Sequence, residues 1–392
     1  MQQGMPQQQT HGVAGAFRPS PRAAVLYRGQ RGAFGCRYEC ETRAALAARL
    51  AALQGLAWEG IWEPVRQYGA ALYYVPHDTL DAGTARALGI RDERDLFGGV
   101  VPHPFVATKA ITQPLVDEDA LAPHGWTHAF HARGPNAVLR GYTAFCAADA
   151  RRAGARLLAH GPFRVKPVRG TGGKGQSVVD SAAALDRVLG GLDASGTLAG
   201  GVVLEENLEQ VTTWSIGRLR VGELLATYIG TQDTTTDNRG ESAYGGSDIT
   251  VVRGDFGALL ALPLSDEARL ALAQVRSYDL RARELFPGLV VSRANYDVAQ
   301  GMDAAGRQRS GVLEQSWRIG GATPAELLAL ERLAADPGLD WVRAECREVY
   351  GGGRAPSEAD LFYSGDDPDV GPITIFARVL GSGRAAEPCA AS

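Results

Sequence analysis

One short segment carries the residue types needed to bind a phosphate group. Residues 163–179 read as a strand, a loop with four glycines in the six positions from Gly170, and a second strand. Glycines allow successive backbone N–H groups to converge on one anion, because no Cβ blocks the approach. Lys166 before the loop and Lys174 within it add positive charge at its root and tip. The segment therefore predicts a β-hairpin that closes over a phosphate-bearing ligand.

The glycine loop matches neither of the two commonest phosphate-binding motifs. In a P-loop, Ser or Thr follows the lysine and a helix begins, whereas here Gly175 and Gln176 follow Lys174, with no Ser or Thr, and a strand comes next. A dinucleotide-binding fingerprint also requires a helix after its glycines. A surface hairpin that binds nothing explains this segment equally well, so both interpretations stay open on this segment alone.

Lysine is so rare in this chain that its positions are informative. Of the 40 basic residues, only Lys109, Lys166 and Lys174 are lysine, and the other 37 are arginine. A compact ammonium group fits between phosphate oxygens, whereas arginine presents a planar fork. Two of the three lysines flank the glycine loop, so we expect Lys109 to belong to the same site.

Two carboxylates on consecutive predicted strands could hold a divalent cation. Asp297 lies in the strand predicted at residues 289–298, and Glu314 lies in its predicted partner at residues 310–316. Antiparallel pairing would bring the two side chains together, where they would repel each other unless a cation lay between them. Mg²⁺ takes such carboxylates together with substrate phosphates. Two carboxylates at solvated strand ends are the alternative.

A glycine pair and an arginine follow the second carboxylate. The glycines at positions 320 and 321 precede Thr323, Pro324 and Glu326, a pattern typical of a helix N-terminus with a capping box. A helix N-terminus attracts anions, and Arg318 beside it could hold a carboxylate or a developing phosphate charge. A purely structural turn is the alternative.

Residues 201–208 form an apolar strand that runs into two carboxylates, Glu205 and Glu206. Such a segment can lie along an adenine ring, with backbone groups at the edge of the ring and Leu208 against its face. An ordinary strand exit is equally compatible with these residues taken alone.

The elements that must position these residues alternate between helices and strands. Residues 230–246 are rich in Thr, Asp and Gly and are expected to form a long loop, of the kind that often serves as a lid. The first hundred residues show no recognisable chemical constellation. A further helical piece is expected after Trp341. The other expected elements are helices at 44–56, 84–88, 137–158, 181–189 and 266–285, and strands at 72–76, 214–221, 224–229 and 373–379.

Composition limits the classes of partner. The net charge of −4 and the pI near 6.0 provide no basic field for nucleic acid or an anionic membrane. No run of 18 or more apolar residues predicts a membrane-spanning helix, and the polar N-terminal segment lacks the form of a signal peptide. The five scattered cysteines indicate reduced thiols, so we expect a cytoplasmic protein.

Taken together, these pieces resemble the ATP-grasp superfamily over roughly residues 105–330. The resemblance implies an α+β fold in which two α+β subdomains with antiparallel sheets grip ATP, preceded by a small α/β domain. The chain is also similar to an uncharacterised bacterial family sometimes labelled biotin carboxylase. The resemblance rests on five ordered pieces: Lys109, the VKP sequence with its glycine hairpin, VVLEENL at 202–208, RANYD at 293–297 and EQSWRIGG at 314–321.

The resemblance implies a role for each matched residue in binding ATP and Mg²⁺. The residues fall into groups for the phosphates, the glycine loop, the adenine ring, the metal and catalysis. They are Lys109 and Lys166 at the phosphates; Gly170, Thr171, Gly172, Gly173, Lys174 and Gly175 closing over them; Glu205, Glu206 and Leu208 at the adenine; Asp297, Glu314 and Ser316 at Mg²⁺; and Arg318, which would stabilise an acyl-phosphate, with Arg293 as catalytic residues.

Two positions depart from the superfamily pattern. The E-x-N metal motif ends here in Ser316, which replaces an amide ligand and would weaken a second metal. In the R-x-D strand motif, either Asn295 or Asp297 could take the place of the aspartate. We prefer Asp297 because it supplies charge.

The resemblance also divides the chain into domains. The ATP-grasp domain would contain a lid subdomain at about residues 155–204. The predicted divisions are residues 1–20 as a disordered tail, 21–104 as the small α/β domain, 105–335 as the ATP-grasp domain, and 336–392 as a C-terminal extension and tail.

The leading functional hypothesis is an ATP- and Mg²⁺-dependent ligase that activates a carboxylate as an acyl-phosphate for attack by an amine or similar nucleophile. A biotin carboxylase is one alternative, although that family has Glu where this chain has Ala322. A non-catalytic ATP-binding module is the other. Small-molecule carboxylate and nucleophile substrates are the expected partners, and assembly into a homo-oligomer is left open. We expect Lys166→Ala to abolish ATP binding while leaving the fold intact.

Overall fold

The computed structural model describes residues 21–29, 35–132, 137–170 and 175–384. The disordered tail expected at residues 1–20 and the last eight residues of the chain lie outside these ranges. The residues from Thr171 to Lys174, in the glycine loop, also lie outside the described part. No helix in the described ranges is long and apolar enough to cross a membrane.

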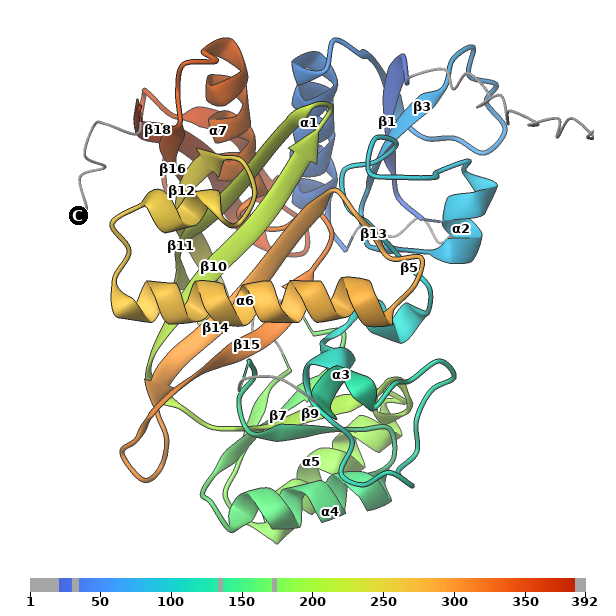
Figure 1. Ribbon diagram of the computed structural model, residues 1–392, viewed down its shortest axis with the longest axis vertical. Coiled ribbons are helices and arrows are strands. Elements are labelled where there is room, and N and C mark those ends of the chain that lie inside the picture. Colours follow the sequence, from blue (N-terminus) through green and yellow to red (C-terminus); the bar gives the residue numbers. More distant parts are fainter. Residues whose placement is uncertain (1–20, 30–34, 133–136, 171–174, 385–392) are drawn as a thin grey trace, which may run out of the picture.

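An eight-stranded antiparallel sheet forms the larger body of the molecule (Figure 1). Side chains alternate between its two faces, so neighbouring residues of one strand join different cores. Tyr228 packs into the core beneath helices α1 (Arg37–Leu53) and α7 (Thr323–Ala335). Ile229 packs into the core beneath helix α6 (Asp266–Leu285). In spatial order the strands are β15 (Gln308–Ser316), β14 (Arg293–Met302), β10 (Glu209–Val221), β11 (Leu224–Thr236), β12 (Ser242–Arg253), β16 (Trp341–Tyr350), β18 (Gly371–Gly383) and β17 (Asp360–Asp367).

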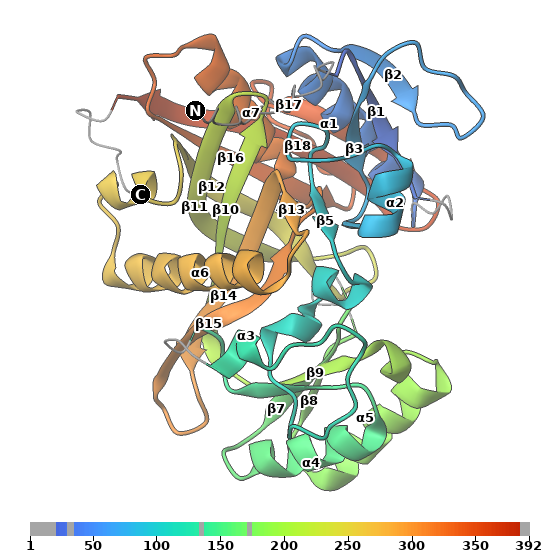
Figure 2. The same ribbon diagram turned by 45° about the vertical axis from the view of Figure 1, so that its right-hand side comes forward.

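A four-stranded antiparallel sheet with two helices forms a second body, drawn at the bottom of Figures 1 and 2. In spatial order its strands are β6 (Gly141–Ala144), β9 (Val202–Glu206), β7 (Phe163–Pro167) and β8 (Ser177–Val179), and its helices are α4 (Ala147–Leu158) and α5 (Ala182–Ala194). This body begins before the predicted lid range of about 155–204. It meets the larger sheet at the edge strand β15, where Val138 forms a parallel bridge with Val312.

The single helix predicted at residues 137–158 is wrong. Strand β6 precedes helix α4, and Cys146 lies at the N-cap of that helix. Gly141 permits the strand, because a Cβ at this position would lie 2.6 Å from the carbonyl oxygen of Leu204 on the paired strand β9. Tyr142 and Thr143 also favour extended backbone. The high alanine content of the segment concealed this short strand.

The first quarter of the chain forms the predicted α/β unit. Strands β1 (Ala23–Tyr27), β2 (Ala57–Ile61) and β3 (Leu72–Pro76) form a parallel sheet in the order β2-β1-β3, and α1 (Arg37–Leu53) packs against it. The smaller elements that follow are β4 (Leu80–Asp81), α2 (Ala82–Ala87), β5 (Gly99–Val101), the 3₁₀ helices η1 (Pro104–Ala107) and η2 (Lys109–Thr112), and α3 (Ala129–Ala132).

The predicted loop at residues 230–246 is instead a long β-hairpin. Strand β11 continues to Thr236 and β12 begins at Ser242, with these two residues paired in register. Threonine-rich strands whose two faces are both partly exposed lack apolar alternation, although threonine favours extended backbone. The expectation of a lid loop here is therefore wrong.

The region predicted as a C-terminal extension completes the large sheet. It contributes strands β16, β17 and β18, and the described residues after α7 (Thr323–Ala335) contain no helix, so the helical piece expected there is wrong. Helix α1 packs against this region. Arg49 forms ion pairs with Glu331 (2.5 Å) and Asp360 (2.8 Å), and the backbone N–H of Tyr38 donates to Asp367 Oδ2 (2.8 Å).

The remaining elements support the edges and the back of the large sheet. The helix expected at residues 266–285 is confirmed as α6 (Asp266–Leu285), with Ser265 accepting the N–H of Ala268 as its N-cap. Short pieces complete the fold: η3 (Leu198–Gly200), η4 (Ala258–Ala261) and β13 (Val290–Val291), which pairs with β5.

Candidate active site

The predicted glycine hairpin is present as strands β7 and β8. Phe163 pairs with Val179 and Val165 with Ser177, in antiparallel register. Gly175 at the far end of the loop has φ +72°, a conformation that favours glycine. The positions of Thr171, Gly172, Gly173 and Lys174 lie outside the described residues, so their phosphate-binding roles remain predictions.

Lys109 connects the glycine hairpin to the predicted metal site. Its ammonium group lies 2.6 Å from Glu314 Oε2 and also donates a hydrogen bond to the carbonyl oxygen of Gly170. Its backbone N–H donates to the carbonyl of Val168 at 3.2 Å. The Lys109 side chain is only 7% exposed, so these contacts are largely shielded from water. The structure thus brings one rare lysine into contact with both predicted parts of the site.

Lys166 and Glu205 form a buried ion pair on adjacent strands. Lys166 Nζ lies 2.5 Å from Glu205 Oε1, and both side chains are almost fully buried. Gln113 Nε2 donates to the other carboxylate oxygen at 3.2 Å. Removing the lysine would leave a buried carboxylate without its cation, which costs about 3–5 kcal/mol. We therefore revise the expectation that Lys166→Ala leaves the fold intact.

Glu206 and Leu208 also have buried side chains. Glu206 accepts the N–H of Arg140 at 2.9 Å and lies 3.1 Å from Arg309 Nη2. Leu208 packs with Leu139 and Ala299 in a small apolar cluster. The side chains predicted to line adenine are thus used in protein contacts, and the backbone N–H groups of Glu206 and Asn207 also donate within the protein, to the carbonyls of Arg140 and Pro162.

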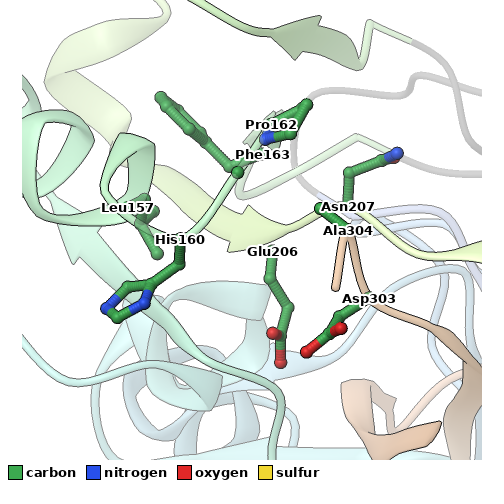
Figure 3. A pocket seen from close by; sticks show the side chains of 9 residues that line it. Leu157, His160, Pro162, Phe163, Glu206, Asn207, Asp303 and Ala304 are labelled. Atoms are coloured by element: carbon green, nitrogen blue, oxygen red, sulfur yellow. The ribbon is translucent and has the colours of Figure 1, made fainter. Parts of the chain in front are cut away.

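A small hollow with room for about one water molecule lies beside Glu206 (Figure 3). In Figure 3, the carboxylates of Glu206 and Asp303 point toward each other, and His160 lies on the same side. The residues that line this hollow do not include Lys109, Lys166, Asp297 or Glu314. Its lining residues are Leu157, His160, Gly161, Pro162, Phe163, Glu206, Asn207, Asp303 and Ala304.

Asp297 and Glu314 lie directly opposite each other on β14 and β15, as predicted. Burial, together with the negative charge of Glu314, raises the pKa of Asp297 to about 7. The amides of Asn295 (2.8 Å) and Gln232 (2.5 Å) donate to Asp297 Oδ1 and oppose this rise, as does the charge of Lys109. In the described part of the chain, no group of three or more His, Cys, Asp or Glu side chains could hold a metal ion.

Ser316 and Asn295 are paired on the same two strands, two positions away from Glu314 and Asp297. The carbonyl oxygen of Ser316 accepts a hydrogen bond from Arg293 Nη1 at 3.2 Å, and its hydroxyl lies 3.5 Å from the same nitrogen. Asn295 donates to Asp297, so the amide predicted as an alternative ligand supports the carboxylate that we preferred.

A fully buried ion pair lies behind the carboxylates. Arg293 and Glu326 are 2.6 Å apart, and their side chains are 1% and 0% exposed. The hydroxyl of Tyr228 lies 2.7 Å from Glu326 Oε1 and 2.7 Å from Asn295 Oδ1. The network thus runs from α7 through Tyr228 and Asn295 to Asp297. The Arg293 guanidinium is held by the Glu326 carboxylate and by the carbonyl oxygens of Ser316 and Arg318.

The capping box predicted at the start of α7 is wrong. Ala322 is the N-cap residue, and the Thr323 hydroxyl accepts the N–H of Gly320 at 3.0 Å. Glu326 faces the core and binds Arg293 instead of the helix N-terminus. Glu326 lies within the run Ala-Glu-Leu-Leu-Ala-Leu, at a helical position that faces the core. This pattern could have predicted that the Glu326 side chain is buried.

Arg318 lies at the boundary between the large sheet and the N-terminal unit. Its Nε atom lies 3.5 Å from Asp78 Oδ1, and its Nη1 atom donates to the carbonyl of Ile319 at 3.1 Å. The side chain is 24% exposed, so it remains accessible to a ligand. Three residues of the N-terminal unit, Arg43, His77 and Asp78, lie near Arg318.

The arrangement of a four-stranded body over a larger antiparallel sheet defines the ATP-grasp fold. Among solved structures, the biotin carboxylase–β-γ-ATP complex from Campylobacter jejuni is similar, with a TM-score of 0.52 and 10% identity over 91% of this chain and 87% of that chain. This likeness confirms the predicted fold class.

The chain belongs to the family described as "Protein of unknown function (DUF3182)", which matches residues 26–377. No curated protein matches its sequence. Two further structures align less well. Phosphoribosylamine–glycine ligase from Thermotoga maritima has a TM-score of 0.47 and 13% identity over 91% of this chain and 92% of that one. D-alanyl-alanine synthetase A from Vibrio cholerae has a TM-score of 0.44 and 11% identity over 79% and 93%, respectively.

Divalent cation binding is expected to tighten as the pH rises through about 7. Because the pKa of Asp297 is raised to about 7, its carboxyl group must lose a proton before it can bind a cation. We expect Mn²⁺ affinity to be about tenfold lower at about pH 6 than at about pH 8. Calorimetric titration of Mn²⁺ measures this difference. Equal affinity at both pH values would contradict the role of Asp297, and Asp297→Asn should flatten the dependence.

Proposed function

We propose that the protein is an ATP- and Mg²⁺-dependent carboxylate ligase. It would activate a carboxylate as an acyl-phosphate, which an amine or similar nucleophile then attacks. The observation that carries this proposal is the position of Lys109, whose ammonium contacts both the glycine hairpin at Gly170 and the carboxylate of Glu314. A phosphate-binding loop and a carboxylate pair joined by one cation favour binding of a nucleotide together with a divalent metal.

The residues present fit a Mg²⁺ ion. Mg²⁺ in nucleotide sites takes one or two carboxylates and completes its coordination with substrate phosphates and water. Asp297 and Glu314 face each other, and burial together with the charge of Glu314 raises the pKa of Asp297; a bound cation would favour the charged form of both carboxylates. When bound, the metal would neutralise charge on the phosphates. We propose that Asp297 and Glu314 are the ligands and that Ser316 contributes at most a weak third oxygen.

Lys109 and Lys166 would hold the phosphates, and residues 205–208 would hold the adenine ring. Lys109 and Lys166 present ammonium groups from η2 and β7, and each lies against a carboxylate. We propose that they bind the phosphate oxygens while the glycine loop covers them. We propose further that residues 205–208 lie along the adenine ring, with their side chains held in place by contacts within the protein.

The other residues would position the reacting groups. The Arg293–Glu326 pair holds Tyr228 and Asn295, which in turn orient Asp297. We propose that Arg318 binds the charge that develops as the carboxylate is activated, because it is a partly exposed arginine that follows the end of β15. Such catalysis consists mainly of positioning and charge neutralisation.

Release of ADP by the purified protein with Mg²⁺ tests the proposal. The protein would be screened with pools of amino acids, small carboxylates, amines, and biotin with bicarbonate. Stimulation by a carboxylate together with an amine would support the ligase. Stimulation by biotin with bicarbonate would indicate a carboxylase instead. Failure to bind ATP at all would contradict the assignment of the glycine hairpin.

Lys166→Ala is expected to weaken ATP binding by about 10- to 100-fold, because a charged contact to phosphate contributes roughly 1.5–3 kcal/mol. It should also lower stability, since Glu205 stays buried without its partner. Titration with a fluorescent ATP analogue measures the first effect, and urea unfolding measures the second.

A second variant separates the two effects of Lys166. Lys166→Ala combined with Glu205→Gln should recover stability without recovering ATP binding, because the uncompensated charge is removed. Arg151→Ala is the matched control, since Arg151 forms an exposed ion pair with Asp186 in the same body. Wild-type ATP affinity in Lys166→Ala would refute the phosphate-binding role.

A further inference from the structure

A second group of charged residues lies where the N-terminal unit meets the large sheet. His77 and Asp78 follow strand β3 directly, and each faces an arginine from a different part of the chain. His77 Nε2 lies 3.1 Å from Arg43 Nη1 on helix α1. Asp78 Oδ1 lies 3.5 Å from Arg318 Nε, beyond the end of β15. Two consecutive residues thus bring two guanidinium groups to one place.

The position of this group is that of a ligand site in an α/β unit. Open parallel sheets bind ligands beyond the carboxyl ends of their strands, and β3 ends at Pro76, immediately before the group. The next residue, Thr79, donates its hydroxyl to the carbonyl of Trp317 at 3.2 Å. This contact fixes the turn against the strand that carries Glu314 and Ser316. The group therefore borders the proposed metal site.

The charges in this group call for an amphoteric ligand. The Arg43 side chain is 12% exposed, and burial together with the nearby charge of Arg318 lowers its pKa. An anion between the two arginines would relieve that repulsion. Both ion pairs in this group are long: Glu39 lies 3.7 Å from Arg43, and Asp78 lies 3.5 Å from Arg318. Two arginines and two carboxylates balance, which matches a zwitterion better than a plain anion.

We propose that Arg43, His77 and Arg318 bind the carboxylate of a small amino-acid substrate, and that Glu39 and Asp78 face its ammonium group. The inference rests on the proposed function, because it places this substrate beside the carboxylates that would hold Mg²⁺. Paired guanidinium groups suit a carboxylate, and a nearby pair of carboxylates selects for an amine on the same molecule.

Calorimetric titration of the full-length protein, saturated with Mg²⁺ and a non-hydrolysable ATP analogue, tests whether these residues bind an amino acid. The probes are glycine, L-alanine and L-glutamate, each paired with its amine-free counterpart: acetate, propionate and glutarate. We expect at least one amino acid to bind, and its amine-free counterpart to bind about tenfold more weakly or worse, since carboxylates facing no amine are left unpaired.

Three variants define which residues form the pocket. Arg43→Gln should weaken binding of the amino acid about tenfold or more while leaving the affinity for the ATP analogue unchanged. Asp78→Asn should weaken the amino acid but not the amine-free acid, and its side chain is 59% exposed, so this variant keeps the fold. Arg37→Gln is the matched control, because Arg37 lies on the same helix with its side chain 54% exposed.

The outcomes separate this inference from the proposed function. If the ATP analogue binds but none of the six probes does, or if Arg43→Gln binds the amino acid like the wild type, the pocket is refuted and the ligase proposal stands. If an amine-free acid binds as tightly as its amino acid, the assignment of Glu39 and Asp78 is refuted. If the ATP analogue fails to bind the wild-type protein, the proposed function itself fails.

Discussion

Glu314→Gln is expected to lower the rate of Mg²⁺-dependent ADP release by about 10²- to 10³-fold, the usual effect of removing one group that stabilises transition-state charge. Glu314 faces Asp297 across the strand pair and holds Lys109 at 2.6 Å. The substitution removes a metal ligand and releases the lysine from its position. It also removes the charge that helps to raise the pKa of Asp297, so that pKa should fall.

The matched control is Asp248→Asn, which removes a carboxylate of similar exposure from the same sheet. The Asp248 side chain is 31% exposed and pairs with Arg347, compared with 28% for Glu314. Its neighbour Ser247 pairs with Gln232, so Asp248 faces the other side of the sheet from Asp297. Release of ADP by Glu314→Gln at the wild-type rate, with Asp248→Asn also unchanged, would refute the metal site.

Glu326→Ala is expected to lower the free energy of unfolding by about 3–5 kcal/mol. Glu326 and Arg293 are 0% and 1% exposed, so removing the carboxylate leaves a guanidinium buried without its counter-ion. The Tyr228 hydroxyl would also lose an acceptor at 2.7 Å. Urea unfolding followed by circular dichroism measures the loss, and ADP release should fall with it because Asn295 and Asp297 lose their support.

A double variant tests whether the effect comes from the stranded charge. Arg293→Met combined with Glu326→Leu should recover a large part of the stability, since replacing both partners removes the buried ion. Glu331→Ala on the same helix is the control, because its pair with Arg49 is partly exposed and should contribute less than about 1 kcal/mol. A loss as large in Glu331→Ala as in Glu326→Ala would contradict this account.

The paired carboxylates could be predicted because strand geometry leaves little freedom. Side chains on paired strands face each other at fixed positions, so two strands joined by a short turn determine which residues meet. Asp297 and Glu314 follow this rule. The strands of the glycine hairpin were predictable for the same reason. The rarity of lysine pointed to Lys109, and its contact with Gly170 places it at the hairpin.

Other parts could not be predicted because local patterns are ambiguous. Near the tip of the hairpin formed by β11 and β12, Thr234, Thr235 and Thr236 pair with Tyr244, Ala243 and Ser242 and show no apolar alternation, so residues 230–246 resemble a loop in sequence. Glu326 matches a capping box equally well by spacing, and only tertiary packing directs it to Arg293. The contacts of Arg43 with His77 and of Asp78 with Arg318 depend on how distant segments assemble, which no local pattern records.

The packing of helix α1 against the last strands also affects how the protein is made. The backbone N–H of Tyr38 bonds Asp367, and Arg49 pairs with Asp360, at sequence separations of 329 and 311 residues. During synthesis, the first helix must wait for almost the whole chain before it finds these partners. Contacts of such separation slow folding and leave apolar surface exposed in the meantime. The N-terminal unit is therefore expected to depend on chaperones until strand β17 has left the ribosome.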